Sequence, residues 1–215
     1  MHKEICLPSK YYKKLNEDIE EQILDDEDDE STSLSHELIK GKIFIDGEIT
    51  KNDGMIFETI VETIKDTFKE NDKFFNELQV HINSDGGDVV AGLNIISQIE
   101  LLKKEGIKVI TFVKEKAYSM AYLIAISGSY RIIRRYAKML LHPSWFMLKG
   151  EIPLTITTMR QYIKDTNETW DIFSDIILSR TKLTKKQLDK IYKNGEDFII
   201  SSDKAVELGC IDKIL

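Results

Sequence analysis

Three short stretches of the sequence hold the residue types that nucleophilic catalysis needs, in a workable order. Residues 83–88 read Asn-Ser-Asp-Gly-Gly-Asp, residues 117–121 read Ala-Tyr-Ser-Met-Ala, and residues 140–143 read Leu-Leu-His-Pro. A serine attacks a carbonyl carbon efficiently only when a base lies beside it and hydrogen-bond donors face the developing oxyanion. The three stretches could supply a serine nucleophile, a histidine base and backbone N–H donors.

Ser119 stands where a predicted strand gives way to a predicted helix. It follows the β-branched run 108–113 and opens the apolar stretch 119–127. A serine at the start of a helix is most often a cap for the first turn. Here the next three residues, Met-Ala-Tyr, are apolar, so the predicted helix enters the core. The N–H groups at such a helix start favour negative charge. Cap and nucleophile both remain open for this residue taken alone.

His142 is the histidine best placed to act as a base. His2 and His36 lie in the N-terminal region, and His81 falls in the middle of a predicted strand. His142 ends a predicted strand and precedes a proline, which favours an extended or turn conformation. A lone histidine in that position is more often structural than catalytic, so its interpretation as a base depends on pairing with Ser119.

Gly86 and Gly87 follow the predicted strand 78–83. Paired glycines permit positive φ angles and a close approach of the backbone to a ligand. They could form a plain strand-to-helix turn, or they could supply N–H donors to an oxyanion. The stretch matches neither GxGxxG nor a phosphate-binding P-loop, so nucleotide binding has no support.

Strands and helices alternate along most of the chain, which predicts an α/β domain with a largely parallel sheet. Alternating or β-branched runs predict strands at 42–49, 78–83, 108–113, 131–134, 139–142 and 210–215. Apolar residues at helical spacing predict helices at 55–68, 89–102, 119–127, 157–178, 184–192 and 202–208.

Length, charge and hydropathy narrow the class of protein. A chain of 215 residues fits one domain by default. The net charge of −7 argues against nucleic acid or an anionic membrane as partner, since both need a basic surface. We see no signal-peptide core and no apolar run of 18 residues, and we therefore expect a cytoplasmic protein. The acidic block within 24–33 predicts a flexible N-terminal segment over 1–40, with the folded domain at 41–215.

Together these stretches resemble the proteolytic subunit of Clp protease, the ClpP family of serine peptidases. The matching stretches are 80–93, 116–128, 139–143 and 202–215, within a resemblance that covers about residues 42 to 215. The resemblance implies the ClpP/crotonase fold, an α/β fold of repeated β-β-α units with a protruding long helix. That helix corresponds here to 157–178.

The resemblance also implies roles for individual residues. Ser119 falls on the nucleophile and His142 on the general base, while Gly87 and Met120 fall on the positions whose backbone N–H groups form the oxyanion hole. The implied reaction is peptide-bond hydrolysis that itself requires no ATP, no metal and no cofactor.

The third catalytic residue is where the sequence departs from the family pattern. The family's aspartate position falls on Lys193, next to Asn194, and neither is a carboxylate. The nearest acids are Asp189, Glu196 and Asp197. We favour Asp197 because it immediately precedes the stretch Phe198-Ile-Ile-Ser-Ser, which we interpret as a further strand, and because it could hold the imidazole tautomer that a triad requires. An uncharged Asn194, or a dyad with no third residue, also remains open.

The resemblance extends to partners and leaves two alternatives. It implies a homo-oligomer of heptameric rings that degrades or processes peptides or unfolded proteins, and it admits an ATP-dependent unfoldase as a partner. It also permits residues 1–40 to be a cleaved propeptide. One alternative is a catalytically weak or inactive ClpP-like structural subunit. The other is a crotonase-type acyl-CoA enzyme, which the pairing of Ser119 with His142 disfavours.

Overall fold

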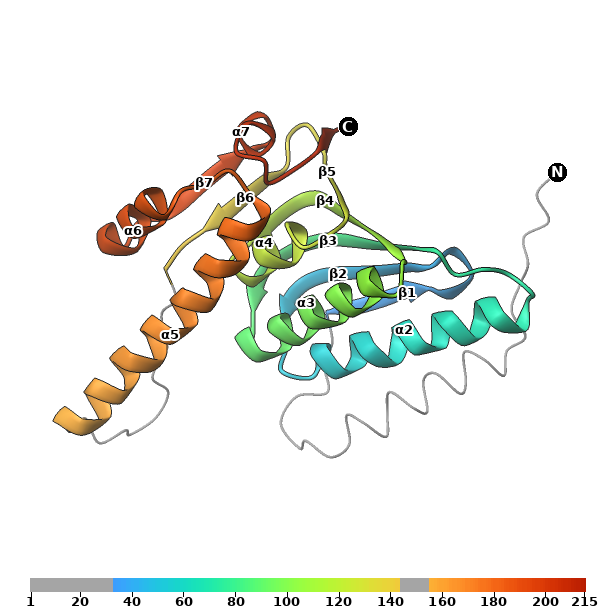
Figure 1. Cartoon of the computed structure of the whole chain (residues 1–215), viewed down its shortest axis with the longest axis horizontal. Coiled ribbons are helices and arrows are strands. Elements are labelled where there is room, and N and C mark those ends of the chain that lie inside the picture. Colours follow the sequence, from blue (N-terminus) through green and yellow to red (C-terminus); the bar gives the residue numbers. More distant parts are fainter. Residues whose placement is uncertain (1–32, 144–154) are drawn as a thin grey trace.

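The computed structural model describes residues 33–143 and 155–215, and their strands form one mixed sheet (Figure 1). The strand order is β1-β2-β3-β4-β5-β8, with β6 paired to β4 and β7 paired to β6. The strands are β1 (Leu34–Glu37), β2 (Lys42–Ile49), β3 (Glu77–Gly87), β4 (Lys108–Tyr118), β5 (Tyr130–Ile133), β6 (Lys138–Leu141), β7 (Phe198–Ser201) and β8 (Lys213–Ile214).

The sheet is parallel apart from two antiparallel pairs, β1 with β2 and β6 with β7. This confirms the predicted α/β class. The helical segments are η1 (Leu38–Lys40), α2 (Asp53–Glu70), α3 (Val89–Lys104), α4 (Met120–Ala125), α5 (Ile156–Arg180), α6 (Lys185–Asn194) and α7 (Ser202–Glu207).

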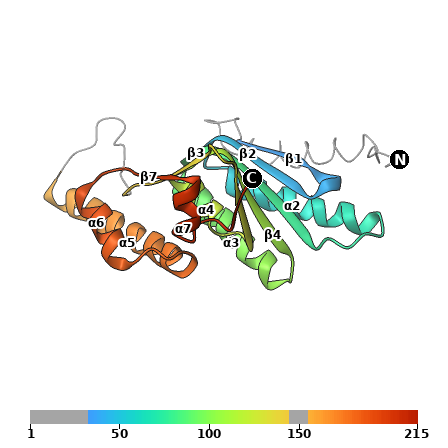
Figure 2. The same cartoon turned by 90° about the horizontal axis from the view of Figure 1, so that it is seen from above.

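Helices α2 and α3 cover one face of the sheet, as Figures 1 and 2 show. Ile56, Ile60 and Ile64 recur every four residues on α2 and are buried in the same apolar cluster as alternate residues of the strands. The long helix α5 projects away from the sheet (Figure 1), as expected for the protruding helix. Among the described helices, none is long and apolar enough to cross a membrane.

Strand β4 is longer than the sequence predicted, and its extension carries the chain to the candidate nucleophile. Residues 114–118, which lie between the predicted strand 108–113 and the predicted helix 119–127, continue the strand. The first part of β4 pairs with β5 at 110–113, and the last part pairs with β6 at 116–118. A register shift on β3 between Ile82 and Ser84 lies beside this change of partner. Such an irregularity re-aims a strand end, and here that end leads directly into Ser119.

Regular structure begins before residue 41, the predicted start of the domain. Of the segment expected to be flexible, residues 33–40 are described, and they form β1 and η1. The carboxylate of Asp53, which is buried at the start of α2, accepts hydrogen bonds from the Ser33 backbone N–H and hydroxyl and from the Thr50 N–H. These bonds fix β1 against the helix. Residues 1–32, and with them the acidic block, lie outside the described residues.

Candidate active site

Ser119 occupies the turn between β4 and α4 in a backbone conformation that a serine rarely adopts. Its φ is 54° and its ψ is −122°. Positive φ in a residue with a Cβ costs free energy and persists only where the surroundings enforce it. The Ser119 side chain makes no capping hydrogen bond to α4, although it stands at the cap position. The structure therefore removes the main support for the capping interpretation and leaves the hydroxyl available for other contacts.

The glycine turn at the end of β3 packs directly against Ser119. A Cβ placed on Gly86 would lie 2.7 Å from the Ser119 Cβ and 3.0 Å from the Met120 backbone nitrogen. A Cβ on Gly87 would lie 2.2 Å from the Ile49 carbonyl oxygen on β2. Both glycines have positive φ, 95° and 146°. No residue with a side chain fits either position, so the glycines are required by packing as well as by conformation.

Two further residues that the sequence analysis missed support this turn. The buried Ser84 hydroxyl accepts a hydrogen bond from the Gly86 N–H at 3.0 Å, which fixes the turn from within. Gly92 on α3 lies beneath Met120, since a Cβ there would come within 2.5 Å of the Met120 Cε atom. A glycine inside a helix is a signal of close packing and could have indicated this contact.

His142 follows β6, the strand that pairs with the end of β4. The Ser119 N–H donates to the Leu140 carbonyl at 3.0 Å, and His142 lies two residues farther along. Its Nδ1 is 2.7 Å from the Pro143 carbonyl oxygen. Because a carbonyl only accepts, this contact favours the tautomer with hydrogen on Nδ1, which in the neutral ring leaves the basic lone pair on Nε2.

The register of β6 and β7 distinguishes the candidates for the third residue. In this antiparallel pair Leu141 faces Phe198, and the same register continued one step beyond the paired residues would place His142 opposite Asp197. Asp189 instead lies on α6, where its carboxylate is 3.6 Å from Lys185. Asn194 is the last residue of that helix, and Glu196 comes two residues later, after the capping Gly195. Asp197 is the carboxylate that the strand pairing brings nearest to the histidine in register.

The buried thiol near the site has the properties of a core group. The Cys210 Sγ lies 3.4 Å from the Tyr122 hydroxyl of α4, and both residues are fully buried. Burial raises the pKa of the Cys210 thiol and raises that of the Tyr122 hydroxyl well above its ordinary value. A thiol without thiolate character is a poor nucleophile. Among the described residues, no group of three or more His, Cys, Asp or Glu side chains could hold a metal ion.

The comparison with protein-family models decides the class of the protein. The model for Clp protease matches residues 25–215. This chain belongs to the Clp protease family. The match confirms the family resemblance, and the protein is accordingly a ClpP-like protease, a hydrolase of peptide bonds.

Individual relatives agree with the family assignment. The chain is 28% identical over 184 residues to ATP-dependent Clp protease proteolytic subunit 2 of Borreliella burgdorferi, covering 85% of this chain and 86% of the relative. It is 25% identical over 179 residues to the subunit 2 of Prochlorococcus marinus, covering 80% of each. A ClpP1 point mutant from Listeria monocytogenes has the same fold, with a TM-score of 0.67 and 18% identity over 83% of this chain and 92% of that one.

Proposed function

We propose that this protein is a serine-type endopeptidase with Ser119 as nucleophile and His142 as general base. The observation that carries the proposal is the forced conformation of Ser119, whose positive φ at a strand-to-helix turn leaves its hydroxyl uncommitted to the helix. A sharp, strained turn of this kind exposes the nucleophile in other serine hydrolases.

In the proposed reaction the Ser119 Oγ attacks the carbonyl carbon of the scissile peptide bond while His142 Nε2 accepts the hydroxyl proton. The backbone N–H groups of Gly87 and Met120 hold the tetrahedral oxyanion. The C–N bond then breaks, the histidine returns the proton to the leaving amine, and an acyl-enzyme forms. Water, activated by the same histidine, hydrolyses the ester and restores the serine.

Asp197 is the proposed third residue, on the strength of its register with His142. Its role would be to stabilise the imidazolium that forms during attack. The Pro143 carbonyl already binds Nδ1 of His142. We therefore propose that the Asp197 carboxylate reinforces an orientation of the imidazole ring that this backbone contact favours.

The proposal extends to assembly and setting. We infer homo-oligomeric rings, heptameric by family resemblance, with peptides or unfolded proteins as substrates and an ATP-dependent unfoldase as a candidate partner. We place the protein in the cytoplasm. Exposed apolar side chains near the start of α5, Ile156, Met159 and Ile163, support the expectation that this helix contributes to assembly.

Hydrolysis of fluorogenic peptides by the purified full-length chain tests the proposal. We expect Ser119→Ala to lower kcat/KM by about 10³-fold or more. Ser97→Ala is the matched control, because that serine is exposed on α3 and, within residues 33–143 and 155–215, its hydroxyl bonds only to the Leu93 carbonyl of its own helix. Equal activity of Ser119→Ala and the wild type would contradict the proposal. Cleavage of an acyl-CoA thioester without cleavage of peptides would favour the crotonase alternative.

A further inference from the structure

The sheet face turned away from α2 and α3 carries an aromatic row flanked by cations. Phe44, His81 and Phe112 lie on β2, β3 and β4, with centroids 5.0 Å apart in each neighbouring pair of rings. They alternate with strand residues buried under the helices, so they occupy the opposite face. The Lys114 Nζ lies 4.5 Å from the Phe44 ring centroid. The surface therefore combines partly exposed rings with positive charge.

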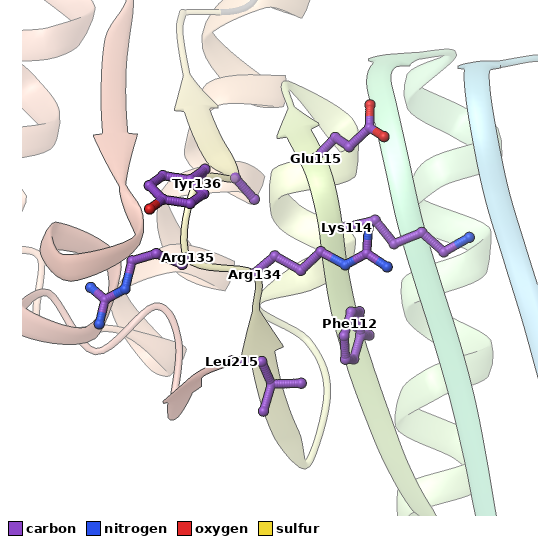
Figure 3. A pocket seen from close by; sticks show the side chains of 8 residues that line it. Phe112, Lys114, Glu115, Arg134, Arg135, Tyr136 and Leu215 are labelled. Carbon is purple, nitrogen blue, oxygen red and sulfur yellow. The ribbon is translucent and has the colours of Figure 1, made fainter.

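A pocket of about 650 Å³ opens beside this row (Figure 3). We call it the cationic pocket, and it is lined by Phe112, Lys114, Glu115, Arg134, Arg135, Tyr136, Ala137 and Leu215. In Figure 3 the Arg134 side chain extends toward β4, while the ends of the Lys114 and Arg135 side chains point in opposite directions.

The charges of the pocket are only partly balanced within the chain. Arg135 is bound to Asp203 at 2.7 Å, and Lys114 is 3.8 Å from the Asp46 carboxylate. Arg134 forms no ion pair with any residue of the described ranges. The nearby cations also affect the neighbouring histidine. Burial first, and then the positive charges of Lys42 and Lys114, lower the pKa of His81 to about 4.

Ser33, the first residue that the structure describes, is connected to this pocket through Asp46. The Asp46 N–H donates to the Ser33 carbonyl at 2.9 Å, and the same Asp46 faces Lys114. Six consecutive acids, Asp25–Glu30, precede Ser33 by three to eight residues. The whole chain has a net charge of −7, and these six acids contribute −6 of it, so the rest of the chain carries a net charge of only −1.

The tether is long enough for these acids to reach the pocket. Ser33 precedes β1 and Arg134 follows β5, and four strand spacings of about 4.8 Å separate those strands, roughly 19 Å in all. An extended chain spans about 3.3–3.6 Å per residue, so Asp26, seven residues from Ser33, reaches roughly 23–25 Å. A tether this short gives an effective concentration in the millimolar range.

We propose that the acidic run Asp25–Glu30 folds back and occupies the cationic pocket of its own chain, with its carboxylates against Lys114 and Arg134. The carboxylates of Asp46 and Glu115 oppose the contact, which keeps it exchangeable and sensitive to salt. Any other acidic or apolar ligand of this surface must displace the run. The inference does not depend on the proposed catalysis.

Disulfide formation in the full-length chain tests this directly. In a Cys6→Ser background, Asp26→Cys is combined either with Tyr136→Cys, in the pocket, or with Glu58→Cys, on α2. Tyr136 and Glu58 are both exposed. Glu58 lies little more than one helical turn beyond Asp53, the residue bonded to Ser33. An N-terminal segment with no preferred binding site would therefore contact Glu58 readily. We expect the pocket pair to close about tenfold faster at low salt.

Neutralising the run or the pocket should abolish that preference. Replacing the five remaining acids of the run by Asn and Gln, substituting Lys114→Gln with Arg134→Gln, or adding 1 M salt should each bring the two rates within about twofold. Equal rates in the charged protein at low salt would overturn the proposal. So would a preference that survives neutralisation, or a pocket disulfide that joins two chains rather than forming within one.

Discussion

The two halves of the candidate site are held in different ways. The nucleophile half, where β3 and β4 end, is fixed by buried contacts. Gly86 packs on the Ser119 Cβ, Gly92 lies under Met120, and Ser84 bonds the glycine turn. The base half lies at the ends of β6 and β7, each four residues long, next to residues 144–154, which lie outside the described ranges. The comparison shows that contacts within a single chain fix the position of the nucleophile more firmly than the position of the base.

The largest effect should come from adding one methyl group to the glycine turn. Gly87→Ala places a Cβ 2.2 Å from the Ile49 carbonyl at a φ of 146°, and we expect at least about 3 kcal/mol lower stability and no measurable peptidase activity. Gly106→Ala is the control, because its φ is 82° but nothing lies within 4 Å of the added Cβ. For the control, thermal unfolding should show a loss of stability of about 1 kcal/mol. Equal losses for both would show that packing at the turn is not special.

Substitutions in the base half should lower activity while leaving stability nearly unchanged. We expect His142→Ala to lower kcat about 10³-fold or more, measured on fluorogenic peptides alongside thermal unfolding. A large fall in melting temperature would contradict the view that this half is weakly coupled to the core.

The third residue can be identified by comparing two aspartates. Asp197→Asn should lower kcat about 10²-fold, less than in a full triad because the Pro143 carbonyl already binds Nδ1. Asp189→Asn, which removes a surface carboxylate paired with Lys185 on α6, should change kcat by less than about twofold. If the Asp197→Asn variant keeps full activity, the site is a dyad.

Ser84 tests how firmly the nucleophile half must be held. Ser84→Ala leaves the Gly86 N–H without its buried acceptor, and a lost hydrogen bond of this kind costs about 1–2 kcal/mol. If the strain falls on the oxyanion donors, kcat should drop roughly tenfold with KM little changed. A change confined to KM would place the effect in substrate binding instead.

The smallest expected effect concerns acid stability away from the site. The pKa of His81 is about 4 in the folded protein, chiefly through burial, against an ordinary value of 6.5. The folded state therefore disfavours the charged ring, and its stability is full above pH 6.5 and declines as the pH falls from there toward 4. Because the ring is partly exposed, we expect this fall in pH to lower the free energy of unfolding by about 1 kcal/mol. The His81→Gln variant should lose this pH dependence in denaturant titrations at pH 7 and pH 4.5, separating acid unfolding from any loss of catalysis.

The sequence predicted those parts of the fold that depend on local pattern. Strand β2 and helices α2 and α3 appear close to their predicted bounds because their apolar residues recur at strand or helical spacing. The same pattern could not show that β4 continues to Tyr118, since that extension depends on a change of pairing partner from β5 to β6. Strand β1 was missed because it is held by Asp53, twenty residues from Ser33 in sequence.

Within the site, residue types were predictable and contacts were not. Ser119 and the glycine pair were recognisable from their place between a strand and a helix. That Gly86, rather than Gly87, packs on Ser119 depends on how β3 ends beside α4. The position of Asp197 relative to His142 depends on the register of β6 and β7, strands far apart in sequence, which no local pattern reveals.

Reaction with a fluorophosphonate probe, followed by intact mass, tests the central claim that Ser119 is an activated nucleophile. We predict one adduct per chain on the wild type, none on Ser119→Ala, and none on His142→Ala within the same reaction time. An undiminished adduct on Ser119→Ala, or no adduct on a folded wild-type protein, would contradict the account.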